Sequence, residues 1–198
     1  NVSQGTVRKA IDEMAAENLL VRRQGRGTFV ASHDDPRSFY RFLRLVPDDG
    51  SAAQTVSVPL SCTTKAADPE VAAALGLSVG EPVIYVERLL RFNGEAVVYD
   101  QIHLVSDLFS GLTLASLSGG ERSLYSVFEN DYGVRMIRAE EHLRAVAADP
   151  ASAKLLSVQA GAPLLLVERT AYTYGEKPVE WRRGLYCTNR HYYRNDLG

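Results

Sequence analysis

The 198-residue sequence has few cysteines, no long apolar run and almost no excess of one charge. Its two cysteines, Cys62 and Cys187, lie far apart without metal-ligand spacing, which excludes a disulfide framework and a cysteine metal site. No apolar run approaches the roughly 18 residues that a membrane-spanning helix needs. A net charge of −2 argues against non-specific coating of nucleic acid. We therefore expect a cytoplasmic globular protein without a metal or a cofactor.

The charges that are present divide the chain into a basic head and an acidic remainder. Residues 1–31 hold five basic and three acidic side chains, so the rest carries 17 basic and 21 acidic of the 22 and 24 in the chain. This asymmetry indicates that only the head meets a polyanion. Further basic residues lie between Arg182 and Arg194, and we interpret these as a solvated strand end rather than a second nucleic-acid surface.

The first 30 residues show the pattern of an amphipathic helix followed by a hairpin. After Ser3, a candidate helix N-cap, apolar side chains recur at spacings of three and four: Val7, Ala10, Ile11 and Met14. Two short strands then flank a glycine-bracketed basic turn at residues 25–27. The pattern fits a winged helix that inserts a helix into the major groove of DNA. It also fits a helix and hairpin docked on a core, with solvated charges.

Two sequence motifs favour the winged helix. The run Asn1-Val-Ser-Gln-Gly-Thr-Val-Arg-Lys-Ala and the run Gly25-Arg-Gly-Thr-Phe-Val resemble the second half of the winged helix of GntR-family regulators. The resemblance implies that six residues face DNA: Ser3, Gln4, Thr6, Arg8, Arg26 and Gly27. The family usually has Arg where this chain has Gln4, so we expect an altered base preference, because Arg can pair with a guanine edge.

The position of this motif also predicts the domain organisation. Residue 1 is Asn and the candidate cap follows at once, so we expect a fragment of a longer polypeptide in which operator DNA binding is impaired. Residues 1–31 are expected to form the C-terminal half of the winged helix, residues 32–38 a polar linker with a proline, and residues 39–198 a second domain.

The second domain is rich in strand patterns. Strands are expected at residues 39–47, 54–64, 82–91, 96–104, 135–147, 163–174 and 179–187. Asn93-Gly94 is a hairpin signal between two of them. Short helices are expected after Ser123, Asp68-Pro69 and Asp149-Pro150, because Ser or Asp caps a helix and Pro suits its first position.

An internal repeat organises these elements. The pattern Asp-Pro, Gly-x-Pro, Val-Glu-Arg begins at Asp68 and recurs 81 residues later at Asp149. Each copy predicts a helix, a turn, a strand and a glycine-containing hairpin. Two such units on one mainly antiparallel sheet give an α+β fold class.

This region resembles the UTRA effector-binding domain of the HutC subfamily of GntR regulators, which shares its fold with chorismate lyase. The resemblance rests on the order of Glu87-Arg-Leu with Asn93-Gly-Glu, Ser123-Leu-Tyr and Pro178-Val-Glu-Trp-Arg. It implies a truncated winged helix-turn-helix followed by a chorismate-lyase-like domain. The function implied is that of a homodimeric transcriptional repressor whose small-molecule effector shifts its binding to operator DNA.

The resemblance also implies an effector site. Family members that sense sugar phosphates bind the phosphate through arginines on the first hairpin strand and a serine that opens a helix. Arg88 and Ser123 match these positions, and four further side chains match positions that contact the rest of the effector: Asp100, Tyr125, Glu180 and Tyr186. The family's second arginine is Leu90 here, so we expect a small anionic effector, a carboxylate or a monophosphate, rather than a sugar phosphate in particular.

Two alternatives stay open from the sequence. Arg88 and Arg169 occupy equivalent positions of the repeat, so each could simply pair with a neighbouring acid, and Tyr125 and Tyr186 could be packing aromatics. The chain could also be an enzyme similar to chorismate lyase that acts on a small carboxylate. The winged helix argues against an enzyme, and we expect no catalytic residues, because no Ser-His-Asp signature, metal motif or phosphate loop is present.

Overall fold

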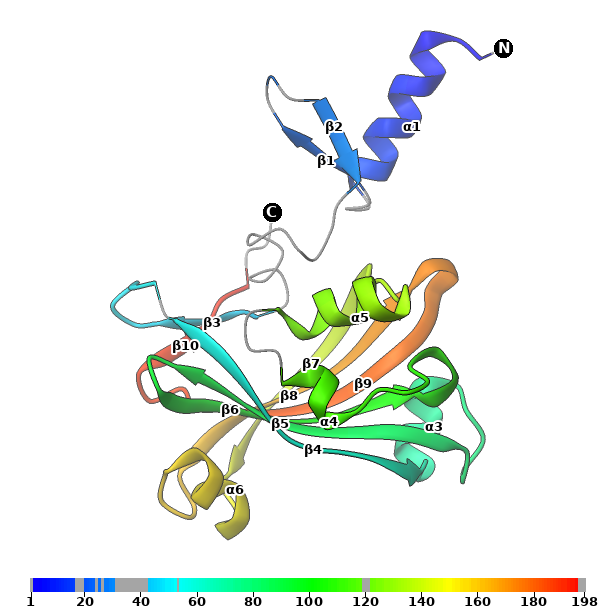
Figure 1. Ribbon diagram of the computed structural model, residues 1–198. Helices are drawn as coiled ribbons and strands as arrows, with labels where there is room; N and C mark the ends of the chain where they lie inside the picture. Colours follow the sequence, from blue (N-terminus) through cyan, green and yellow to red (C-terminus); the bar gives the residue numbers. More distant parts are fainter. Residues whose placement is uncertain are drawn as a thin grey trace.

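The computed structural model describes residues 2–16, 20–23, 25, 27–30, 43–52, 54–118 and 122–195 (Figure 1). At the N-terminal end, helix α1 (Gln4–Ala16) precedes a hairpin of β1 (Leu20–Arg23) and β2 (Gly27–Val30), as predicted. The hydroxyl Oγ of Ser3 accepts the Thr6 N–H at 3.1 Å and so caps α1. Arg26 and the predicted linker 32–38 lie outside the described residues.

A six-stranded antiparallel sheet forms the body of the second region, in the order β4-β5-β6-β9-β8-β7. Its strands lie close to the predicted ranges: β4 (Thr55–Ala66), β5 (Pro82–Phe92), β6 (Glu95–Val105), β7 (Arg138–Ala147), β8 (Pro163–Thr173) and β9 (Lys177–Tyr186). The β5–β6 turn has Gly94 at φ +88°, a backbone conformation that favours glycine.

The predicted repeat is present in the topology of this sheet. One unit is β4, α3 (Pro69–Leu75), β5 and β6, and the other is β7, α6 (Pro150–Leu156), β8 and β9. Asp68 and Asp149 cap the two helices in the same way, by accepting backbone N–H groups of the first turn. The central strands β6 and β9 pair with each other and join the two units.

The helices cover opposite faces of the sheet. Helix α5 (Leu124–Tyr132) packs on the face that carries Val86 of β5 and Ile102 of β6. Helices α3 and α6 pack on the other face, α3 against Val83 and Trp181 and α6 in a cluster with Leu89. A 3₁₀ turn (Ser106–Leu108) and the short α4 (Leu114–Leu117) connect β6 to α5, and a second 3₁₀ turn (Tyr174–Glu176) joins β8 to β9. No helix among the described residues is long and apolar enough to cross a membrane.

A separate two-stranded ribbon lies beside the β5–β6 hairpin (Figure 1). It pairs β3 (Leu45–Pro47), which follows the undescribed residues 31–42, with β10 (His191–Tyr193) near the C-terminus. Leu43 and Leu45 pack with Leu90 and other buried residues of the sheet. The sequence predicted a strand at 39–47 but none at 191–193, because three residues are too few to show alternation.

Candidate functional site

A buried pair of opposite charges lies on the α5 side of the sheet. Arg88 of β5 is 7% exposed and faces Asp100 of β6, its register partner. The Arg88 Nε and Nη2 atoms lie 2.9 and 2.8 Å from Asp100 Oδ2. Leu90 lies two residues further along β5, so strand alternation places it on the same face as Arg88. Its side chain belongs to a buried hydrophobic cluster that includes Tyr186. Position 90 therefore supplies apolar packing where the family pattern has a second cation.

A second arginine joins this pair from β9. Arg182 Nη1 lies 3.2 Å from Asp100 Oδ2, and Arg182 Nη2 lies 2.8 Å from Glu180 Oε1. The Tyr125 hydroxyl of α5 donates to the same Glu180 oxygen at 3.1 Å. The structure thus brings Arg88, Asp100, Tyr125 and Glu180 into one polar cluster, which Arg182 completes.

The sequence-based interpretation of Arg182 as part of a solvated strand end is wrong. Its side chain is 4% exposed, and its partners are fully buried carboxylates. A signal for this was present in the sequence, because Glu180 and Arg182 are two residues apart on a predicted strand and must share a face. The residues at the far end of the chain, Arg190 and Arg194, are exposed as expected.

A third arginine extends the cluster toward the β3–β10 ribbon. Arg169 of β8 is 2% exposed, and its Nε donates to Glu141 Oε1 of β7 at 2.6 Å. Tyr193 of β10 donates to the other oxygen of Glu141. Arg169 also hydrogen-bonds Tyr125. Arg88 and Arg169, which occupy equivalent positions of the repeat, therefore each pair with an acid. This was one of the alternatives that the sequence left open.

Burial shifts the pKa values of several groups in this cluster. It raises the pKa of Tyr125 and raises that of Tyr186 to about 12, so both phenols are neutral at physiological pH. Burial lowers the pKa of the Arg88 guanidinium, while the Asp100 charge opposes this effect. Two carboxylate oxygens, Asp100 Oδ1 and Glu180 Oε2, are buried without a hydrogen-bond partner among the described residues. Such groups are costly unless another donor reaches them.

Ser123 lies at the edge of this region, at the start of α5. Its Oγ caps the helix by accepting the Ser126 N–H at 3.1 Å. A small cavity of about 10 Å³, room for roughly one water, lies beneath this helix start. It is lined by Ser57, Pro59, Val86, Arg88, Leu117, Arg122, Leu124 and Val127. Of the six predicted effector residues, only Arg88 lines it.

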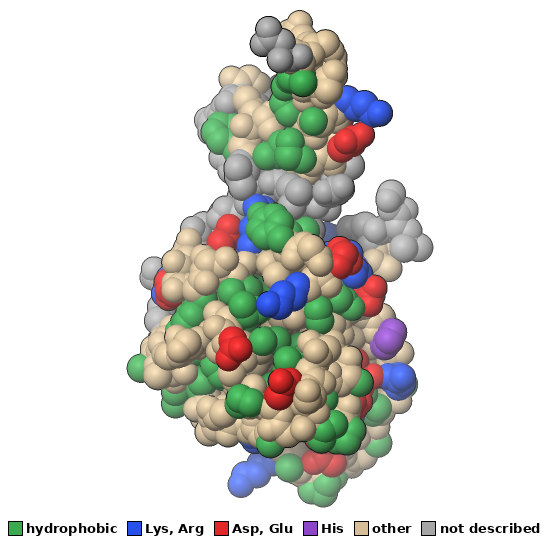
Figure 2. Space-filling model, turned by 90° about the vertical axis from the view of Figure 1, so that its right-hand side faces the viewer, with side chains coloured by type: hydrophobic (Ala, Val, Ile, Leu, Met, Phe, Trp, Pro, Cys, Tyr) green, Lys and Arg blue, Asp and Glu red, His purple; other side chains and the backbone are tan. Residues whose placement is uncertain are grey.

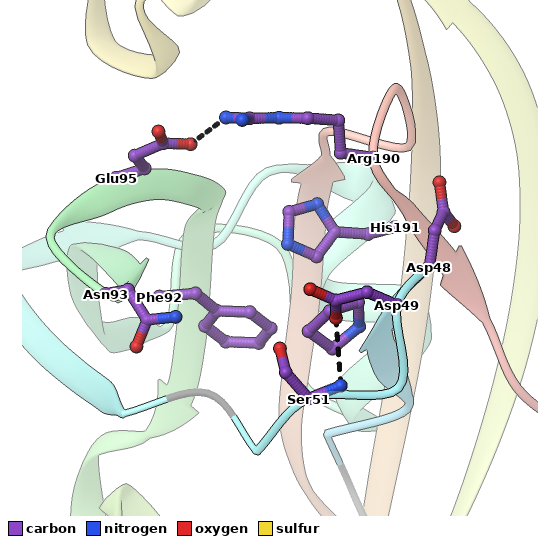
Figure 3. A pocket seen from close by; sticks show the side chains of 9 residues that line it. Asp48, Asp49, Ser51, Phe92, Asn93, Glu95, Arg190 and His191 are labelled. Atoms are coloured by element: carbon purple, nitrogen blue, oxygen red, sulfur yellow. Dashed lines mark hydrogen bonds and ion pairs between the residues drawn. The ribbon is translucent and has the colours of Figure 1, made fainter.

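A larger cavity lies elsewhere, between the β3–β10 ribbon and the β5–β6 turn (Figure 3). Its volume is about 320 Å³, and none of the predicted effector residues lines it. Glu95 pairs with Arg190 at one side, and Asp49 accepts the Ser51 N–H at 2.9 Å at the other. The His191 ring packs against Phe92 at 5.5 Å. The cavity is larger than the one at Arg88, but it has no buried arginine to hold an anion.

The predicted DNA-facing residues of α1 lie on the surface. Ser3, Gln4, Thr6 and Arg8 are exposed, and so is Gly27 at the start of β2. Ser3 and Thr6 are already joined through their hydroxyls at 2.9 Å. On the face of the molecule in Figure 2, acidic and basic side chains of the described residues are scattered, and neither sign gathers into a large patch.

Comparisons with known proteins match both regions. The UTRA domain model matches residues 53–192, and the model for bacterial regulatory proteins of the gntR family matches residues 1–30. The transcriptional repressor PhnF of Mycolicibacterium smegmatis is 30% identical over 96% of this chain and 76% of its own length. The repressor NagR of Bacillus subtilis is 27% identical over 96% of this chain and 77% of its own. The crystal structure of the ligand-binding domain of a GntR-family regulator from Bordetella bronchiseptica has a TM-score of 0.78 at 47% identity, and it covers 80% of this chain and 99% of that one.

Proposed function

Because this chain belongs to the GntR family of bacterial regulators and carries a UTRA domain, we propose that it represses transcription under the control of a small anionic effector bound beneath α5. The chain is a transcriptional regulator and not an enzyme, since its relatives are named regulators and repressors. The lyase alternative is therefore set aside. The chemistry and position of the effector are the proposed part.

The observation that carries the effector site is the buried Arg88 beside the start of α5. A buried guanidinium is a strong partner for an oxyanion, and the N-terminus of a helix adds N–H donors and a favourable dipole. Tyr125 and Glu180 lie in the same polar cluster and offer a donor and an acceptor to the remainder of a ligand. Ser123 and Tyr186, at two edges of the cluster, complete the proposed set with Asp100.

On the DNA side, we propose that the exposed start of α1 reads operator DNA. Four residues at the start of α1 would face the major groove: Ser3, Gln4, Thr6 and Arg8. Gly27 would contact DNA from the wing, and the same role for Arg26 stays a prediction outside the described residues. We propose further that the protein acts in the cytoplasm as a homodimer on two-fold symmetric sites. Impaired operator binding by this chain also stays a prediction.

A thermal-shift screen tests the effector site. The compounds are phosphate monoesters, organic acids, amino sugars and amino acids. A ligand at 100 times its Kd adds about 2.7 kcal/mol to the free energy of unfolding, which gives a visible rise in Tm. We expect an anionic hit whose shift is lost in Arg88→Ala and reduced in Ser123→Ala. The control is Arg138→Ala, which removes an exposed arginine of β7 outside the site.

Two results would contradict the proposal in different ways. If only amino sugars or zwitterionic amino acids raise Tm, the anionic character of the effector is wrong while the regulator assignment stands. If anionic hits shift wild type and Arg88→Ala equally, the site lies elsewhere in the domain.

A further inference from the structure

Two arginines from different elements line the small cavity beneath the start of α5. Arg88 reaches it from β5, and Arg122 reaches it from the position just before the cap Ser123. Leu117, Leu124 and Val127 make part of the wall apolar. Two arginines in the wall of one partly apolar cavity can present their guanidinium groups to a carboxylate or a phosphate.

The electrostatics of α5 also favour an anion at this position. The N-terminal end of a helix carries a partial positive charge, which acidic residues in the first turn often offset. The first turn of α5 has no acidic residue, and Arg122 directly precedes the cap residue Ser123. Arg122 pairs instead with Asp131 in the last turn of the same helix, with Nη1–Oδ1 at 2.8 Å and Nη2–Oδ2 at 2.9 Å.

We propose that Arg122 is the second guanidinium of the effector site and supplies the positive charge that Leu90 does not. This inference rests on the anionic effector proposed above. The anion lies between Arg88 and Arg122 at the start of α5. Arg122 then sets the preference of the site for groups with two negative charges, such as phosphate monoesters, over singly charged carboxylates.

Both arginines can exchange their present partners for such an anion. Arg122 is 46% exposed and Asp131 37%, and exposed ion pairs contribute little to stability. Asp100 Oδ2 lies 3.2 Å from Arg182, so it keeps a cationic partner when Arg88 turns to the ligand. The cavity of about 10 Å³ must widen to admit an anion, and Arg122 is the most exposed charged residue of its wall.

The test is a calorimetric titration of the whole chain with inorganic phosphate at low ionic strength. Arg122→Ala is expected to raise the Kd about tenfold or more, since it removes charge-assisted hydrogen bonds, and Arg122→Lys should give an intermediate Kd. Asp131→Asn is expected to lower the Kd a few-fold, because it releases Arg122 from its present partner. Arg138→Ala, on an exposed edge of the sheet, should leave the Kd unchanged.

The Arg122 and Asp131 variants are expected to change the Kd in opposite directions, so a general loss of folding cannot account for both results. If Arg122→Ala does not fold, Arg122→Lys and Asp131→Asn still decide it. An unchanged Kd in Arg122→Ala, with loss of binding in Arg88→Ala, would overturn the role of Arg122 and leave the proposed effector site intact. Absence of phosphate binding by wild type would overturn the inference as well. The proposed function would then still stand if another anion in the wider screen binds in an Arg88-dependent way.

Discussion

Asp100 is fully buried, and two arginines, Arg88 and Arg182, approach the same one of its oxygens. A buried ion pair of this kind contributes little net stability, because the desolvation of both charges offsets their attraction. Breaking it by removal of one partner is costly. The cluster is therefore poor evidence for stabilisation and better evidence for a site that handles charge, which is how we interpret it.

Gly184 shows how tightly this site is packed. A Cβ at position 184 would lie 2.8 Å from Asp100 Oδ1 and 2.5 Å from a Tyr186 ring carbon. We expect Gly184→Ala to lower the free energy of unfolding by about 1–3 kcal/mol, because the ring and the carboxylate must both shift. Urea denaturation measures this change.

The matched control for this prediction is Gly5→Ala. A Cβ at Gly5 would meet only Ser3 Oγ, at 3.6 Å, and Gly5 lies in an exposed helix. The control should leave stability unchanged or raise it slightly, because alanine favours helix. Equal changes in the free energy of unfolding for the two substitutions would show that the close contacts of a Cβ at position 184 do not destabilise the fold.

At the scale of elements, an Asp-Pro cap begins the helix of each repeat unit. Asp149 accepts N–H groups from Ala151 and Ser152, and the hydrogen bond from the Ser152 hydroxyl is the main reason that its pKa lies below the ordinary value of 3.8. A carboxyl with a lowered pKa stabilises the fold above its unfolded pKa, and this contribution is lost as pH falls through the folded value.

We therefore expect Asp149→Ala to lower Tm near neutral pH, with the gap to wild type narrowing as pH falls below about 4. Asp149→Asn keeps a cap acceptor without a titrating group, so its Tm should show a weaker dependence on pH in the same range. Thermal denaturation across this pH range provides the measurement. A Tm difference between Asp149→Ala and wild type that stays constant at every pH would contradict the stabilising role of the charged Asp149 carboxylate.

The β3–β10 ribbon is the second element whose attachment can be tested. Tyr193 of β10 donates to Glu141 of the sheet, and Glu141 also holds the buried Arg169. Tyr193→Phe removes one donor from a largely buried carboxylate, so we expect a loss of about 1–3 kcal/mol in the free energy of unfolding. Tyr192→Phe is the control, since Tyr192 is 44% exposed. An unchanged stability in both variants would mean that the Tyr193 contact does not hold the ribbon.

Local signals account for the elements that could be predicted. Asp-Pro caps, the Asn93-Gly94 turn and the repeat of 81 residues predicted the helices and hairpins of the sheet, because each depends on residues close in sequence. The β3–β10 pairing joins residues 45–47 to 191–193, and no local pattern marks it. It could not be predicted for that reason.

The same distinction holds for the site. Arg88, Asp100, Tyr125 and Glu180 were predicted from family motifs, and they lie in one cluster. The partners that complete the cluster come from strand register across β7, β8 and β9, which the sequence does not reveal. The Arg169–Glu141–Tyr193 contacts were missed for this reason. Arg182 was misassigned although its spacing from Glu180 on a predicted strand placed the two side chains on one face. Contact between the predicted residues and an effector stays a prediction.

At the scale of the whole molecule, we expect the proposed repressor to act as a two-fold dimer. We expect sedimentation velocity to give twice the 21.8 kDa mass of the chain at micromolar concentration. A two-fold protein reads two half-sites of one operator, so dimerisation sets the symmetry of the DNA that is recognised. Sedimentation of this chain at its monomer mass, unchanged as concentration rises, would contradict the dimer.

The central claim is that an anion bound at Arg88 controls DNA binding, and one measurement tests it most directly. Fluorescence anisotropy, at protein concentrations high enough for the weak operator binding predicted above, gives the Kd for a duplex selected from a random library, with and without the saturating effector identified in the screen. We expect the effector to change this Kd by about 5- to 150-fold in wild type, the usual range of coupling between two sites, and to leave it unchanged in Arg88→Ala. An identical Kd with and without effector in wild type would contradict the claim, since the two sites would then be uncoupled.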